Sequence, residues 1–63
     1  MKLTRHAIER YAERFGADRD TARDELERLA LKAKPYQQDR QYVHEEAEGV
    51  TVVRVQGVIV TVY

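Results

Sequence analysis

The sequence contains no cysteine, no tryptophan and a single proline, and its acidic and basic residues balance. Without cysteine, neither a disulfide nor a thiolate metal site can stabilise the fold. A chain of 63 residues suits one domain, which we place at residues 1–63, and such a domain buries only about 60% of its unfolded surface. Packing, with or without self-association, must therefore supply the stability.

The balance of charge limits the kind of nucleic-acid binding that the chain can support. Eleven basic and eleven acidic residues give a formal net charge of zero, whereas proteins held to nucleic acid mainly through phosphates are usually basic overall. Residues 1–34 carry a net charge of +2 and residues 35–63 one of −2. Any contact with nucleic acid must therefore come from a local patch.

Long apolar runs are also absent. Residues 1–6 lack the apolar stretch of a signal peptide, and no segment approaches the roughly 18 apolar residues that a transmembrane helix needs. The lack of cysteine fits a reducing compartment. We therefore expect a cytoplasmic protein with no membrane contact.

Two amphipathic helices are predicted in the first half of the chain. Thr4 is a plausible N-cap for a helix that ends near Phe15, and Gly16 follows as a left-handed stop. A second helix is expected to begin near Asp18 or Thr21 and to end before Pro35. Their apolar residues recur at helical spacing on one face, namely Ala7, Ile8, Tyr11, Ala12 and Phe15 in the first helix and Ala22, Leu26, Leu29, Ala30 and Ala33 in the second.

The second half of the chain is typical of an antiparallel sheet. Residues 36–43 alternate as an exposed or edge strand would, and residues 45–49 form a charged turn. The runs 50–55 and 58–63, separated by Gln56-Gly57, predict a β-hairpin. We therefore expect an α+β fold in which two antiparallel N-terminal helices pack on a three-stranded antiparallel sheet.

The hairpin register decides which side chains face the helices. A two-residue loop pairs Val55 with Val58, and a three-residue loop pairs Arg54 with Val58. We prefer the two-residue loop because it places Arg54 on the face opposite the all-valine face. In either register Val58, Val60 and Val62 are expected to pack on the helices, leaving Ile59, Thr61 and Tyr63 available.

A stripe of cationic side chains runs along the first predicted helix. His6, Arg10 and Arg14 lie at i, i+4 and i+8, and like charges at this spacing cost a helix a few tenths of a kcal/mol. A stripe retained at that cost could bind an anion. Alternatively, Glu9 and Glu13 neutralise it and the stripe is an ordinary solvated face.

Histidine and arginine are also the residue types that metal-independent RNA cleavage requires. The reaction takes a proton from a 2′-hydroxyl, stabilises a charged phosphorane and protonates the leaving oxygen. Histidine can move the protons and arginine can hold the phosphate. The candidate catalytic residues are His6, Arg10, Arg54 and Tyr63, and the candidate binding residues are Arg14, Arg40, Tyr42 and Thr61.

Other site chemistries have less support in the sequence. Tyr36 and Tyr42 on a strand could stack nucleic-acid bases, or they could simply cover a sheet face. The run His44-Glu45-Glu46 contains residue types that can bind a metal ion, but it lacks the paired ligand spacing of known metal sites. We therefore expect no metal. There is no phosphate-binding glycine loop, nucleophile elbow or dinucleotide fingerprint, and no cofactor is expected.

The first helix also carries a resemblance. The run from His6 to Gly16 resembles a motif, His-Ala-x-x-Arg-x-x-x-Arg-x-Gly, that opens a family of small bacterial and phage proteins of unassigned function. That family is grouped with RelE-like and BrnT-like toxins. The resemblance implies a minimal RelE-like fold and an RNA-cleaving or RNA-binding function, and it maps the family's histidine and two arginines onto His6, Arg10 and Arg14.

Three functions stay open at this point. The first is a RelE-like, metal-independent endoribonuclease or RNA-binding protein, for which the resemblance implies an antitoxin or a host target as the protein partner. The second is a non-enzymatic interaction module, such as a phage inhibitor that docks on a host protein through an exposed sheet edge. The third is a structural homodimer that adds burial to a small core.

Overall fold

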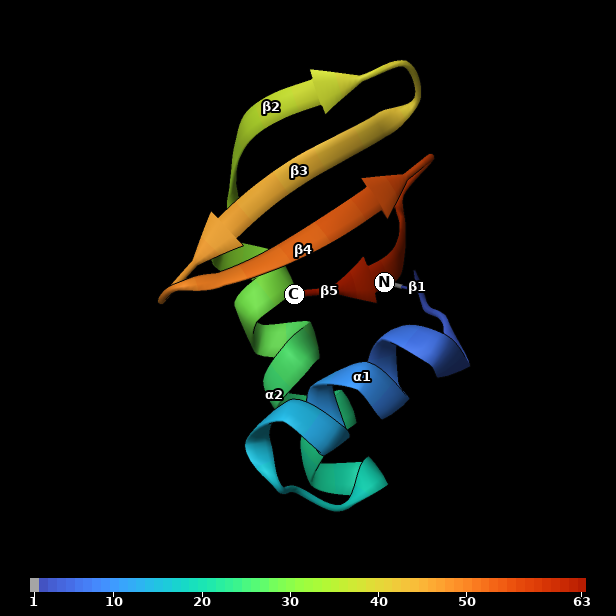
Figure 1. Ribbon diagram of the computed structural model, residues 1–63, viewed down its shortest axis with the longest axis vertical. Helices are drawn as coiled ribbons and strands as arrows, with labels where there is room; N and C mark the ends of the chain where they lie inside the picture. The colour runs from blue at the N-terminus through green and yellow to red at the C-terminus, as the bar shows by residue number, and fades with distance from the viewer. Residues whose placement is uncertain (1) are drawn as a thin grey trace.

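The computed structural model describes residues 2–63, and both helices pack against the same side of a five-stranded sheet (Figure 1). No helix in this range is long and apolar enough to cross a membrane. The elements in chain order are β1 (Lys2–Leu3), α1 (Arg5–Phe15), α2 (Arg19–Lys32), β2 (Lys34–Asp39), β3 (Tyr42–Ala47), β4 (Val50–Val55) and β5 (Val58–Val62).

The sheet differs from the expected one, although the α+β class holds. Its strand order is β1-β5-β4-β3-β2, with β1 parallel to β5 and the other pairs antiparallel. The prediction of a three-stranded antiparallel sheet is therefore wrong. Residues 36–43 are not one strand, because the chain reverses at Arg40-Gln41 and makes a β2–β3 hairpin. The parallel pair arises because Lys2 and Leu3 lie beside Val58 and Ile59.

Both helices begin at side-chain caps. Thr4 Oγ1 accepts a hydrogen bond from the Ala7 N–H at 3.1 Å, and α1 ends at Gly16, whose φ of 66° is left-handed. Asp18 Oδ1 accepts from the Thr21 N–H at 2.8 Å, and this bond lowers the pKa of Asp18. Thr4 and Gly16 act as predicted, and Asp18 rather than Thr21 caps the second helix.

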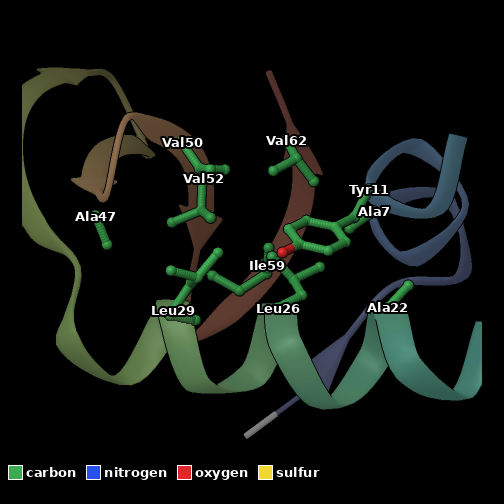
Figure 2. Packing of buried hydrophobic residues seen from close by; sticks show 11 residues of the cluster. Ala7, Tyr11, Ala22, Leu26, Leu29, Ala47, Val50, Val52, Ile59 and Val62 are labelled. Atoms are coloured by element: carbon green, nitrogen blue, oxygen red, sulfur yellow. The ribbon is translucent and has the colours of Figure 1, made fainter. Parts of the chain in front are cut away.

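The two helices cross each other instead of lying antiparallel side by side (Figures 1 and 2). Tyr11 of α1 is buried at the crossing, and its hydroxyl donates to Glu25 Oε1 of α2 at 3.0 Å. Burial and this carboxylate together raise the pKa of Tyr11. The core lies between the helices and the sheet and consists of Ala7, Tyr11, Ala22, Leu26, Leu29, Ala30, Ala47, Val50, Val52, Ile59 and Val62 (Figure 2).

The last two hairpins share one kind of turn. Glu48 and Gly49 have φ values of 52° and 77°, and Gln56 and Gly57 have 50° and 80°. Two consecutive positive φ values are those of a type I′ turn, which suits the twist of the strands. The turn predicted at residues 45–49 is therefore confined to Glu48-Gly49, because residues 45–47 belong to β3.

A β-bulge in β5 changes which of its side chains face the helices. Val55 pairs with Val58 as predicted, but Val53 pairs with Thr61 and Arg54 with Ile59, which leaves Val60 as an extra residue. Ile59 and Val62 are consequently both buried in the core. The expectation that the valine face packs on the helices and Ile59 faces away is therefore wrong.

Candidate nucleic-acid interface

The face of the sheet that points away from the helices carries a row of aromatic side chains. Tyr36 of β2, His44 of β3 and Tyr63 beyond β5 follow one another, with ring centroids 6.3 Å and 6.2 Å apart. Tyr36 and Tyr63 are 56% and 48% exposed. Both helices pack on the other side of the sheet, so this face presents two exposed tyrosine rings and a half-buried imidazole to solvent.

A buried valine supports the row from below. Val53 is only 4% exposed and does not belong to the core beneath the helices. It pairs with His44 on one side and with Thr61 on the other, and side chains on paired residues share a face. The aromatic row thus rests on packed neighbours, which limits the freedom of its rings.

Hydrogen bonds hold the two ends of the row. The Tyr63 hydroxyl lies 2.8 Å from His44 Nδ1, and the Tyr36 hydroxyl lies 3.3 Å from Thr51 Oγ1. The phenol of Tyr63 donates to an unprotonated Nδ1, or a protonated Nδ1–H donates to the phenol oxygen. An imidazole and a phenol therefore lie in hydrogen-bonding contact on the open face.

Three of the predicted binding residues lie on or beside this face. Tyr42 is two residues from His44 along β3, so it lies on the same face, and it is exposed. Thr61 joins the face through its pairing with Val53. Arg40 lies in the β2–β3 turn with a φ of 59°, and its carbonyl accepts from Gln38 Nε2 at 3.1 Å. The guanidinium of Arg40 is therefore available next to the Tyr42 end of the face.

At the Tyr63 end, the face adjoins a hollow of about 500 Å³ beside α1. The hollow is lined by Arg10, Glu13 and Arg14 of α1 and by Val62 and Tyr63. Arg10 and Tyr63, two of the four predicted catalytic residues, therefore share one hollow with the predicted binding residue Arg14. Arg14 also lies over the Phe15 ring, 5.1 Å from its centroid.

Arg54 lies on the other side of the sheet. It shares a face with Ile59, as the preferred register implied, but that face packs on the helices. Its Nε and Nη2 donate to the two oxygens of Glu45 at 3.0 Å and 2.9 Å, and Nη2 also donates to the Ala30 carbonyl at 2.9 Å. These bonds tie β3 and β4 to the end of α2. The structure thus separates Arg54 from Tyr63, with which the sequence analysis had grouped it.

His6 is exposed in the first turn of α1. Within residues 2–63, its side chain makes no hydrogen bond and lines none of the hollows that contain the other candidates. The structure does not bring His6 into contact with Arg54 or Tyr63. The histidine that does contact Tyr63 is His44, which the sequence analysis considered as a metal ligand and did not select as a catalytic residue.

Metal ligation by residues 44–46 meets a geometric obstacle. Successive strand residues point to opposite faces, so Glu45 is buried towards the helices while His44 and Glu46 lie on the open face. Among the described residues, no three His, Asp or Glu side chains are grouped closely enough to hold a metal ion.

Comparison of the chain with protein-family models, with curated proteins and with solved structures gives no match. The fold and the site together define a small α+β protein with an aromatic open sheet face and a cationic hollow at one end of it. The resemblance of residues 6–16 to the toxin-related family stays a prediction.

Proposed function

We propose that the protein binds single-stranded RNA on the open face of its sheet. The row Tyr36–His44–Tyr63 supports this function, because unpaired bases stack on exposed aromatic rings held on a sheet. Tyr42 adds a fourth ring on the same face. Arg40 lies at one end of the face and Arg10 and Arg14 at the other, so cations are available to backbone phosphates at both ends.

Stacking also reconciles RNA binding with the absence of net charge. A neutral chain cannot obtain its affinity mainly from phosphate neutralisation, whereas base–aromatic stacking needs no net charge. Expected affinity is modest, and its dependence on salt is weaker than that of a strongly basic protein. The resemblance of the first helix to toxin-related proteins favours RNA over single-stranded DNA as the ligand.

The test is binding of a fluorescein-labelled, unstructured RNA followed by anisotropy. Tyr36→Ala should weaken binding roughly 5- to 150-fold, because stacking contributes about 1–3 kcal/mol per base. Tyr36→Phe retains the ring and should bind nearly as well as the wild type. Leu31→Ala is the matched control, since Leu31 is a large apolar side chain that is 73% exposed on α2 and far from the open face.

Two results would overturn the proposal. One is equal loss of affinity in Tyr36→Ala and Leu31→Ala, and the other is no binding by the wild type at low salt. In the second case the exposed edge of β2 becomes the leading surface. All six of its residues are exposed, and such an edge can accept a strand from a protein partner. The same oligonucleotide made of DNA measures the preference for RNA.

Cleavage of the bound RNA is a second candidate, favoured by the contact between His44 and Tyr63. In this reaction a base removes the 2′-hydroxyl proton, the 2′-oxygen attacks phosphorus and the 5′-oxygen leaves with a proton, giving a 2′,3′-cyclic phosphate. His44 would act as the base for a phosphodiester bound beside it, and solvent water would supply the proton that the 5′-oxygen takes as it leaves. Arg10 and Arg14 would stabilise the charge on phosphorus.

Purified proteins incubated with RNA in EDTA test the cleavage candidate. His44→Ala should abolish cleavage while His6→Ala retains it, since only His44 contacts Tyr63. The reverse result would support the catalytic role that the sequence predicted for His6. Intact RNA with the wild type, under conditions in which it binds, would leave binding as the function and remove catalysis.

A further inference from the structure

The hollow at the end of β5 is lined by two arginines that make no ion pair with any described residue. Arg10 and Arg14 lie one turn apart on α1 and line the same hollow. Among residues 2–63, neither guanidinium has an acidic oxygen within ion-pair distance. Glu13 lines the hollow between them, yet it pairs with neither.

Among the described residues, three of the other four helix arginines make ion pairs, and Arg28 of α2 makes none. Arg5 and Arg19 both contact Glu9, at 3.1 Å and 2.8 Å, and Arg23 contacts Asp20 at 3.1 Å. The protein thus has acidic side chains that pair with cations elsewhere on the helices. Two like charges at i, i+4 repel each other and disfavour the helix slightly, so an anion that bridges them would relieve the repulsion.

The lining of the hollow also suits an anion. It brings the donors of two guanidinium groups beside the buried Val62 and the exposed Tyr63. Arg14 is held over the Phe15 ring at 5.1 Å, and such stacking restricts a guanidinium that would otherwise be free. Arginine presents paired N–H donors that match phosphate oxygens better than an ammonium group does.

We infer that this hollow is a phosphate-binding site in which Arg10 and Arg14 hold a single phosphate group between them. The next step rests on the proposed function. In the complex with RNA, this phosphate belongs to the nucleotide next to the one whose base stacks on Tyr63. The phosphate is either internal to the strand or at its end, because both offer the same oxygens. Glu13 lowers the affinity and keeps the site from holding anions tightly.

Titration of inorganic phosphate tests the site without RNA. Arginine Nε–Hε signals followed by NMR should shift saturably for Arg10 and Arg14, with sodium chloride of equal ionic strength as the comparison. The double variant Arg10→Gln/Arg14→Gln should fold normally, because both side chains are exposed. In this variant, the NMR signals of the other residues around the hollow should no longer shift when phosphate is added. Arg28→Gln is the matched control, an exposed arginine of α2 outside this hollow.

Two further variants separate a phosphate site from general electrostatics. Arg10→Lys/Arg14→Lys keeps both charges and loses the paired donors, so phosphate should bind several-fold more weakly than to the wild type. Glu13→Gln removes the opposing charge and should bind phosphate more tightly. No saturable shift in the wild type, or an equal shift in the Arg10→Gln/Arg14→Gln variant, would overturn the inference.

Measurements of RNA binding then determine which phosphate of the strand occupies the hollow. Removing both arginines from the hollow should lower the slope of log K against log salt by about 0.7, the contribution of one phosphate contact on a single strand. Comparison of 5′-phosphorylated, 3′-phosphorylated and unphosphorylated RNA distinguishes a terminal from an internal phosphate. Phosphate binding without RNA binding removes only the proposed function, whereas stacking-dependent RNA binding with an unchanged slope removes only the phosphate site.

Discussion

Arg54 provides the sharpest test of whether a predicted catalytic residue is structural. Its guanidinium makes a two-pronged ion pair with Glu45 and a third bond to the Ala30 carbonyl. The side chains of Glu45 and Arg54 are only 10% and 22% exposed. Removing one partner of a buried pair costs about 3–5 kcal/mol, because the other charge stays buried without compensation. The partial exposure of Arg54 favours the lower end, about 3 kcal/mol.

That cost is large for this chain. At about 0.05–0.15 kcal/mol per residue, a domain of this length has a free energy of unfolding of about 3–9 kcal/mol. Arg54→Met should therefore lower the urea midpoint strongly in far-UV circular dichroism and should leave much of the protein unfolded at physiological temperature. The double variant Arg54→Met/Glu45→Leu should recover most of the loss, because apolar residues often replace a buried ion pair at little cost.

RNA binding by the double variant completes the experiment. A folded double variant should bind the labelled RNA as the wild type does, since Arg54 lies on the helix side of the sheet. The reasoning is refuted if Arg54→Met has the wild-type urea midpoint. It is also refuted if the double variant is fully folded and has lost RNA binding, since Arg54 would then act on the ligand.

Three further predictions concern the fold. Leu26 is fully buried, so Leu26→Ala should destabilise the protein by about 2–5 kcal/mol in thermal denaturation. Gln56 adopts a φ of 50° in a type I′ turn, so Gln56→Asn should stabilise it by about 0.5–1 kcal/mol in urea. The pKa of Asp18 is lowered by its bond from Thr21, so its contribution is present above the unfolded-state pKa and is lost as pH falls through the folded value. Asp18→Asn should therefore flatten the stability profile below about pH 4, and an unchanged profile would contradict that assignment.

Local signals account for the parts of the fold that were predictable. The cap at Thr4, the stop at Gly16 and the apolar spacing of each helix act within a few residues, and so does the Gln56-Gly57 turn. The β2–β3 hairpin was missed because its turn, Arg40-Gln41, contains no glycine. The strand β1 has only two residues, too few for any periodicity. Its parallel pairing depends on a contact across nearly the whole chain.

The sequence predicted which types of residue could form the site but not which of them lie together in the fold. Sequence alternation indicated that Ile59, Thr61 and Tyr63 lie on an available sheet face. The structure places Thr61 and Tyr63 on the open face, whereas Ile59 is buried in the core. The placement of Arg54 depended on recognising Glu45 as its partner, and Glu45 was assigned to a turn. The bulge at Val60 likewise depends on packing and has no signature in the sequence, so the burial of Ile59 could not be anticipated.

The distribution of charge explains how a neutral chain can still present a cationic site. Most of the acidic residues that form ion pairs connect one secondary-structure element to another. Glu45 pairs with Arg54, and Glu48 pairs with Lys32. Neutralisation is therefore local, and the arginines left without partners in the hollow retain their full charge. Because the chain has no net charge, phosphate contacts should orient a bound strand more than they hold it, and stacking on the aromatic row should supply most of the affinity. Removing a ring should accordingly weaken RNA binding at every salt concentration, whereas removing an arginine should do so mainly at low salt.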